Sequence, residues 1–177
     1  MNASFIKSCV EWSLRLFVGM SIGVYGIAKT TQFDDPAVIT TAVKDLSGMR
    51  LMWAFYGYSK PYVMIIGVLE MLGGLMLMFN RTKLLACLLL TVILSNIILQ
   101  DIYYGVNQGA LWGAIFYQLF ILILLFGERA RLAKLFQIAT AQQPKVPSTI
   151  HPIVKISLII ALSLLLEFAT RLITHNS

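Results

Sequence analysis

Long apolar stretches alternate with short charged or turn-forming segments along this chain. Residues 102–127 hold 26 positions without a charge, and residues 84–100 hold 17. A helix needs about 20 apolar residues to cross the hydrocarbon layer of a bilayer. The pattern therefore predicts a helical membrane protein with five membrane-spanning helices, near residues 9–29, 61–79, 84–101, 110–127 and 153–173.

The segments between these windows differ in length and character. Residues 30–60 form a long connection, in which we expect a short surface helix near residues 36–46. After residue 128 a basic segment carries apolar side chains at helical spacing, which is typical of a helix that lies on the membrane surface. The residues of this stripe are Leu132, Leu135, Phe136 and Ala139.

Three prolines fall within residues 141–152 and predict a semi-extended linker. The predicted organisation is a four-span bundle with its amphipathic extension over residues 1–140, this linker, and a fifth membrane helix with a short tail over residues 153–177. The fold class that we expect is all-α, a polytopic membrane four-helix bundle with an additional C-terminal transmembrane helix.

Composition narrows the class further. Only 12% of the residues are charged, 58% are hydrophobic, and the mean hydropathy is +0.80. Soluble domains carry roughly 25% charged residues, so a soluble globular domain, a disordered tail and a nucleic-acid-binding module are all excluded. The lipid bilayer is the main partner, and the net charge of +6 fits loops that anionic lipid attracts.

The basic residues favour an orientation with the N-terminus in the cytoplasm. The side of the N-terminus holds seven cations: Lys7, Arg81, Lys83, Arg129, Arg131, Lys134 and Lys145. The opposite side holds five: Lys29, Lys44, Arg50, Lys60 and Arg171. Because short loops follow the positive-inside rule most strongly, we expect a multi-pass protein of the bacterial cytoplasmic membrane, with its N-terminus inside and its C-terminus outside.

Two of the predicted spans carry a charge in their interior, Arg15 in the first and Glu70 in the second. Each charge shares a helical face with glycines that allow close helix packing: Gly19, Gly23, Gly26, Gly67 and Gly74. An intramembrane charge costs several kcal/mol unless it is paired or hydrated. At ~1.5 Å per residue the two charges differ in depth by about 6–8 Å, so we expect a buried Arg15–Glu70 ion pair.

Two roles for this pair stay open. It fixes the register of the two helices, which is a known use of buried polar groups, or it forms a polar site for a proton-linked or quinone-like ligand. The third and fourth spans add Asn96, Gln100 and Gln118, which line the same interior or hydrogen-bond between helices.

Aromatic residues gather on the predicted outer side, among them Tyr58, Tyr103 and Tyr104. An interfacial belt is their ordinary interpretation. The alternative is an outer mouth, formed with Lys29 and Asp101, around the head group of a ligand.

Metal and nucleophile motifs are missing from the sequence. The two histidines, His151 and His175, lie outside the four-span core and lack the spacing of zinc or haem ligands. We therefore expect no metal site, no catalytic residue and no independent enzymatic activity. A quinone is the one cofactor that the buried polar centre leaves open.

Several short motifs, in their order, resemble the DoxX-like family of membrane proteins. The first helix carries Leu14-Arg15-Leu16, Gly19 and Gly26-x-x-Lys29. The second carries residues 53–59 (WAFYGYS), then Gly67-x-x-Glu70-x-x-Gly73-Gly74 and Arg81-Thr82, and Asn96 of the third also fits. The similarity covers about residues 10–135 and implies a four-helix membrane bundle, from whose usual pattern the fifth span departs.

The family takes its name from a subunit associated with thiosulfate:quinone oxidoreduction, and distant relatives act as assembly chaperones or cargo receptors. The resemblance thus implies an accessory subunit, the first hypothesis being a subunit of a quinone-linked redox complex. The alternative is a non-catalytic scaffold or assembly chaperone for another membrane protein. The third is a small transporter or pore, which would need to form a homo-oligomer to line a polar path.

Overall fold

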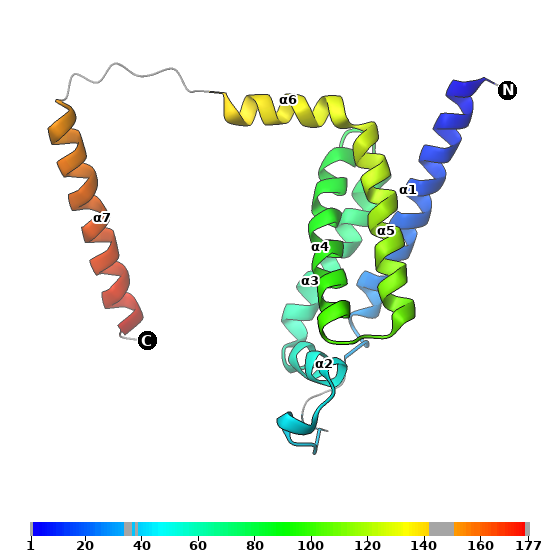
Figure 1. Cartoon of the computed structure of the whole chain (residues 1–177), viewed down its shortest axis with the longest axis horizontal. Coiled ribbons are helices and arrows are strands. Elements are labelled where there is room, and N and C mark those ends of the chain that lie inside the picture. The colour runs from blue at the N-terminus through cyan, green and yellow to red at the C-terminus, as the bar shows by residue number, and fades with distance from the viewer. Residues whose placement is uncertain (1, 34–36, 38, 142–150, 176–177) are drawn as a thin grey trace. The chain divides into compact units, whose positions relative to one another are not determined.

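The computed structural model describes residues 2–33, 37, 39–141 and 151–175, and within these the regular structure is helical, with no strand. Its elements are α1 (Ala3–Ala28), the 3-10 helix η2 (Val43–Asp45), α2 (Gly48–Tyr58), α3 (Lys60–Leu77), α4 (Lys83–Tyr103), α5 (Gln108–Gly127), α6 (Arg129–Thr140) and α7 (Pro152–His175) (Figure 1). The all-α expectation is confirmed.

The chain divides into two compact units, Met1–Ala139 and Thr140–Ser177. The first unit contains every helix from α1 to the greater part of α6, and the second contains α7. Of the predicted linker, residues 142–150 lie outside the described residues.

Four helices are long and apolar enough to cross a membrane: Lys60–Leu77, Lys83–Tyr103, Gln108–Gly127 and Pro152–Leu172. They match four of the five predicted spans, and the protein is a membrane protein. Helix α1 is also long, but Glu11 and Arg15 lower its hydropathy and it is not among the four. That α1 crosses the membrane stays a prediction.

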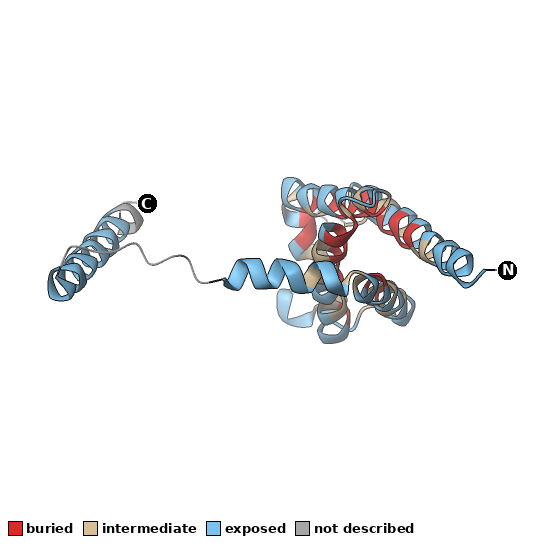
Figure 2. Cartoon of the chain, turned by 90° about the horizontal axis from the view of Figure 1, so that it is seen from above, coloured by how far each residue is buried: buried red, intermediate tan, exposed pale blue. Residues whose placement is uncertain are grey.

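Helices α1, α3, α4 and α5 form an antiparallel bundle in which α1 contacts α3 and α5, and α4 contacts α3 and α5. Its core consists of apolar side chains from all four helices, among them Val18, Leu77, Leu90 and Ile121, each wholly buried. Figure 2 shows buried positions on the inward faces and exposed positions outside. Large exposed apolar side chains cover those outer faces, as a lipid-facing surface requires.

Glycines set the close approach of α1 and α3. A methyl group built on Gly19 would lie 2.9 Å from the carbonyl oxygen of Gly74, and one built on Gly26 would lie 2.5 Å from that of Gly67. The two backbones therefore touch at two levels, seven residues apart on each helix. Four of the five glycines predicted to pack helices do so.

Gly23 is the exception, and its predicted packing role is wrong. A methyl group built there would meet nothing within 4 Å. At about 100° per residue, Gly26 returns to the face of Gly19, whereas Gly23 is rotated by about 40° from it. The contact thus repeats every seven residues, and the Gly19-x-x-x-Gly23 spacing does not describe it.

One end of the bundle carries the short helix α2, and we name it the α2 end; the opposite end, from which α6 departs, is the α6 end. The expectation of a helix near residues 36–46 is wrong for residues 39–46, where the regular structure is the 3-10 turn Val43–Asp45, and residues 36 and 38 lie outside the described residues. The regular α-helix of this connection is α2. It begins after Ser47, whose side chain accepts a hydrogen bond from the backbone N–H of Arg50.

Helix α6 follows α5 almost directly and has no buried residue. The side chains of Leu135, Phe136 and Ile138 on it are exposed. The residues of the predicted apolar stripe therefore lie on a helix, as the prediction requires.

We expect the stripe of α6 to enter the lipid head-group layer. A Leu135→Trp variant in lipid nanodiscs should be quenched by lipids brominated near the head group. Gln137, on the opposite side of α6, supplies the control: Gln137→Trp should instead be quenched by aqueous acrylamide. Equal quenching of the two added tryptophans, each measured above the wild-type signal, would contradict a surface-lying helix.

Candidate ligand-binding site

The predicted Arg15–Glu70 pair is wrong. Because Gly19 meets Gly74 and Gly26 meets Gly67, Glu70 lies level with Gly23. This level is eight residues from Arg15, or about 12 Å along the helix. The estimate from span ends placed the two charges too close together, because it set residue 9 level with the inner end of the second span, whereas Arg15 itself lies level with the end of α3 and contacts the Leu77 carbonyl oxygen there.

Arg15 instead belongs to the α6 end, where it is 1% exposed. Its Nε donates to the Leu77 carbonyl oxygen at 2.6 Å, and its Nη1 donates to Asn80 Oδ1 at 2.6 Å. Glu11, one turn away, adds an ion pair at 3.6 Å, and the guanidinium lies 3.9 Å from the centre of the Trp12 ring. Through the bond to Leu77, Arg15 caps the last turn of α3.

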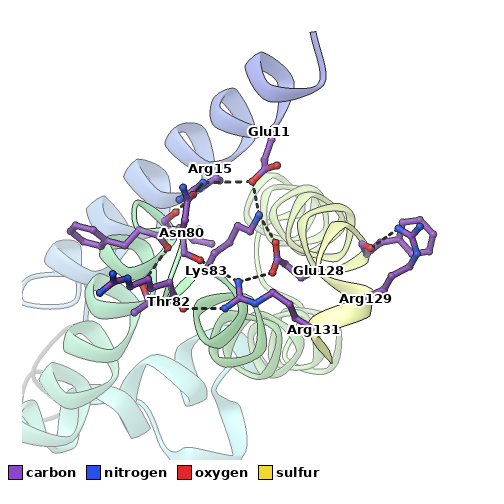
Figure 3. A network of polar contacts seen from close by, with 12 residues as sticks. Glu11, Arg15, Asn80, Thr82, Lys83, Glu128, Arg129 and Arg131 are labelled. Atoms are coloured by element: carbon purple, nitrogen blue, oxygen red, sulfur yellow. Dashed lines mark hydrogen bonds and ion pairs between the residues drawn. The ribbon is translucent and has the colours of Figure 1, made fainter. Parts of the chain in front are cut away.

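A second set of charges ties α1, α4 and α5 together at the same end (Figure 3). The Lys83 ammonium lies 2.5 Å from a Glu11 oxygen and 2.6 Å from a Glu128 oxygen. Arg131 pairs with Glu128 at 2.8 Å. Burial alone would raise the pKa of the Glu128 carboxyl, but the hydrogen bonds from Lys83 and Arg131 outweigh it and hold that pKa below its ordinary value. The charges of this network thus pair with one another, while Nη2 of the adjoining Arg15 is buried without a hydrogen-bond partner among the described residues.

Glu70 belongs to a different cluster, toward the α2 end. Its Oε1 lies 3.5 Å from the ammonium of Lys29, and its side chain is 1% exposed. Lys29 stands at the C-terminal end of α1 and donates a hydrogen bond to Gln32 Oε1 at 3.2 Å. Asp101, from the last turn of α4, is 6% exposed.

Two adjoining cavities contain this cluster. One has a volume of about 480 Å³ and the other of about 290 Å³, and Lys29, Glu70 and Asp101 line both. Ligand pockets commonly measure roughly 300–1,000 Å³. The remaining wall of the larger cavity is mainly apolar and aromatic, with Trp53 from α2 and Ala114 from α5 among its residues.

The carboxylates of this cluster are not fully satisfied. Both oxygens of Glu70 and Oδ2 of Asp101 are buried without a hydrogen-bond partner among the described residues. The 3.5 Å separation between Glu70 and Lys29 is an ion pair, yet it does not meet hydrogen-bond geometry. A buried acceptor that lacks its hydrogen bond costs about 1–3 kcal/mol, and a charged acceptor costs more. The cavity is therefore suited to a polar head group.

Helix α2 supplies part of the wall of both cavities. Met52 and Tyr56 are buried on it, and both line the smaller cavity. Tyr56 stacks on Phe33 with ring centres 5.0 Å apart and donates a hydrogen bond to Gln100 Oε1 at 2.8 Å. This hydrogen bond links α2 to α4.

Only some of the residues predicted to form an outer mouth lie together in the structure. Lys29 and Asp101 line both cavities, as the mouth hypothesis requires. Tyr58 and Tyr103 are 84% and 81% exposed and take no part in either cavity. Tyr104 lines a separate pocket of about 210 Å³.

The polar residues predicted for the bundle interior do not all lie at one site. Asn96 and Gln100 line the smaller cavity, on the same side as Glu70. Gln118 lines neither cavity, and its side-chain oxygen is buried without a hydrogen-bond partner among the described residues.

Sequence reasoning named Trp53 only as one of the outer aromatics and missed Tyr25 and Gln32, and all three line the larger cavity. Tyr25 precedes Lys29 by four residues, so a helical projection of α1 places both on one face. Gln32 lies beyond α1, and Trp53 lies on a helix that was not predicted. Their places in the site follow from tertiary structure.

The described residues contain no group of three or more His, Cys, Asp or Glu side chains that could hold a metal ion. What the fold and the site define is a polytopic helical membrane protein with a polar cluster inside an otherwise apolar cavity.

Comparison with known proteins places the chain in a family. It is 30% identical over 136 residues to the uncharacterised protein YwoB of Bacillus subtilis (strain 168), and the match covers 75% of this chain and 85% of YwoB. The chain belongs to the same family as YwoB. No family model matches the chain. No solved structure matches it either.

Proposed function

We propose that this protein is an integral-membrane accessory subunit that binds a quinone-type ligand in the larger cavity of the α2 end and has no catalytic centre of its own. The supporting observation is the cavity itself. Its wall is mainly apolar, yet it contains Lys29, Glu70 and Asp101. An apolar pocket with a few convergent polar groups is the usual form of a site for a small lipophilic molecule.

The proposal includes a membrane and an orientation. Five cations, Arg81, Lys83, Arg129, Arg131 and Lys134, lie at the α6 end. By the positive-inside rule this end faces the cytoplasm of a bacterium. With α1 and α7 both crossing the membrane, the N-terminus lies inside and the C-terminus outside. The resemblance to DoxX-like proteins agrees with an accessory role in a quinone-linked redox complex.

Filling the larger cavity should abolish binding. Ala114 is 6% exposed and lines this cavity, so Ala114→Phe removes volume without changing a charge. We expect the dissociation constant of a decyl-substituted benzoquinone, or of its hydroquinone, to rise at least tenfold, which corresponds to about 1.4 kcal/mol. Quenching of Trp53 fluorescence reports binding in a nanodisc-embedded chain in which Trp12 and Trp112 are replaced by Phe.

The control is Ala161→Phe, at an exposed position of α7, which should leave the dissociation constant unchanged. Thermal unfolding of both variants separates loss of the cavity from loss of the fold. If neither redox form quenches Trp53 saturably beyond its partition into protein-free nanodiscs, the proposed function is wrong.

A scaffold or assembly-chaperone role is the second candidate, and one feature favours it. An open apolar groove of about 440 Å³ runs between α1 and α3, with Gly23, Met71 and Leu72 among its lining residues. The helix of another membrane protein would fit such a groove. Crosslinking from a photoreactive residue at position 72 distinguishes the candidates: a single stoichiometric protein adduct favours the scaffold, and lipid adducts alone favour the ligand-binding subunit.

A further inference from the structure

The charges of the larger cavity do not balance. Lys29 is the one cation among its described lining residues, whereas Glu70 and Asp101 are both carboxylic acids. With all three groups ionised, the cavity carries one net negative charge. Charge inside a low-dielectric site is costly unless it is compensated, so an occupant that carries positive polarity would be stabilised there.

The buried atoms that lack a hydrogen-bond partner also favour an occupant that donates hydrogen bonds. The buried side-chain atoms without a partner around the cavity are three oxygens: Oε1 and Oε2 of Glu70 and Oδ2 of Asp101. Ionised carboxylates only accept hydrogen bonds. Among the described lining residues of the larger cavity, no buried nitrogen donor is left without a partner. The buried groups that lack a partner around this cavity are therefore all hydrogen-bond acceptors.

Two neighbouring donors are engaged with other residues. Lys29 donates to Gln32 at 3.2 Å and faces Glu70 at 3.5 Å. In the smaller cavity, the hydroxyl group of Tyr56 donates to Gln100 at 2.8 Å. Neither satisfies the three open carboxylate oxygens.

We propose that the larger cavity selects lipophilic ligands whose head group donates hydrogen bonds through O–H or N–H, and discriminates against head groups that only accept. A hydroquinone has two O–H donors, and a primary alkylammonium has three N–H donors and a compensating charge. The shared chemistry of these two ligand sources is a donor at the end of an apolar body. This inference rests on the proposed function only in requiring that an amphiphile enters the cavity.

The opposite preference has a clear physical origin. If Glu70 and Asp101 were protonated in the empty site, each carboxyl group would become a hydrogen-bond donor. The cavity would then hold the carbonyl oxygens of an oxidised quinone at least as well as the hydroxyl groups of the reduced form. The preference between matched ligands therefore distinguishes the two protonation states directly.

Two matched pairs of probes test the proposal on the full chain in nanodiscs, with Trp53 fluorescence as the readout for quinones and competition for amines. The first pair is a decyl hydroquinone and the corresponding benzoquinone. The second is dodecylammonium and dodecyltrimethylammonium, which share a charge and chain length but differ in N–H donors. We expect the donor-bearing member to bind at least tenfold more tightly in the pair that occupies the cavity.

Carboxylate variants assign the preference to the site. Glu70→Gln replaces one carboxylate oxygen by an amide N–H₂ at nearly the same shape, and it should reduce the preference at least fivefold. Glu167→Gln on α7, where the carboxylate is exposed, should leave the preference unchanged. Ala114→Phe should weaken every probe that occupies the cavity.

The outcomes separate this inference from the proposed function. Tighter binding of dodecylammonium than of its trimethyl counterpart, with no binding of either quinone form, would support the donor inference and remove the quinone-type assignment. Equal or tighter binding of the benzoquinone, with no preference between the ammonium probes, would overturn the inference and leave the quinone-type assignment standing. Binding of no probe at all would overturn both.

Discussion

Replacing Gly26 by alanine is expected to destabilise the protein by about 1–3 kcal/mol, the usual cost of overpacking a well-packed contact. The added methyl group would lie 2.5 Å from the Gly67 carbonyl oxygen and 2.7 Å from Met71 Cγ. A backbone oxygen cannot move aside as a flexible side chain can, so α1 and α3 must separate. Unfolding in mixed detergent–SDS micelles measures the change in free energy.

The same substitution one turn earlier is a matched control. Gly23→Ala adds its methyl group to open space on the same helix. Alanine is favoured over glycine inside a helix by up to about 1 kcal/mol, so this variant should be neutral or more stable than the wild type. If both variants shift the free energy of unfolding in the same direction by similar amounts, the glycine contact between α1 and α3 is not as described.

Replacing Lys83 by methionine is expected to cost about 2 kcal/mol, the order of a hydrogen bond to a charged group, because it removes the buried cation that Glu11 and Glu128 share and leaves them only Arg15 and Arg131 as partners. The ammonium is the shared partner of Glu11 and Glu128, at 2.5 and 2.6 Å. Without it, two carboxylates from different helices face each other at the α6 end. Chemical unfolding of the variant and of the wild type at the same pH measures the loss.

Two further variants test that explanation. Lys134→Met, at an exposed position of α6, should change the free energy of unfolding by less than about 0.5 kcal/mol. Adding Glu11→Gln and Glu128→Gln to Lys83→Met should recover more than half of the loss, since neutral groups no longer repel. A triple variant no more stable than Lys83→Met would show that the loss comes from packing of the lysine stem rather than from charge.

The sequence was most informative where one physical requirement acts locally. Bilayer thickness fixes the length of an apolar helix, so α3, α4, α5 and α7 were predicted within a few residues of their observed bounds. Small residues on a shared face correctly indicated the α1–α3 contact. Lys29 and Asp101, which the sequence grouped as a possible outer mouth, line the same two cavities.

Contacts that depend on register were not predictable in the same way. The depths of Arg15 and Glu70 were estimated by aligning the ends of the two spans, whereas α1 extends beyond the end of α3 and Arg15 lies level with that end. The actual register is set by which glycines meet, and it gives Glu70 to Lys29 and Arg15 to Asn80. An error of about one helical turn in register is enough to exchange the partners of a buried charge.

Helix α2 was missed for a different reason. Residues 53–59 combine aromatic and small residues, a composition that also fits an interfacial belt. The segment is too short to show a clear helical period. The helix is held by tertiary contacts such as the Tyr56–Gln100 hydrogen bond and the stacking of Tyr56 on Phe33. Such contacts join segments distant in sequence, so the wall that α2 adds to the larger cavity could not be derived from the local pattern.

The central claim is that Glu70 is coupled to Lys29 at the α2 end and not to Arg15 at the α6 end. Two double-mutant cycles on the free energy of unfolding test it, one combining Lys29→Met with Glu70→Gln and the other combining Arg15→Met with Glu70→Gln. We predict a coupling energy of about 1–3 kcal/mol for the first cycle and less than about 0.5 kcal/mol for the second. A second cycle with the larger coupling, or a first cycle with none, would contradict the account.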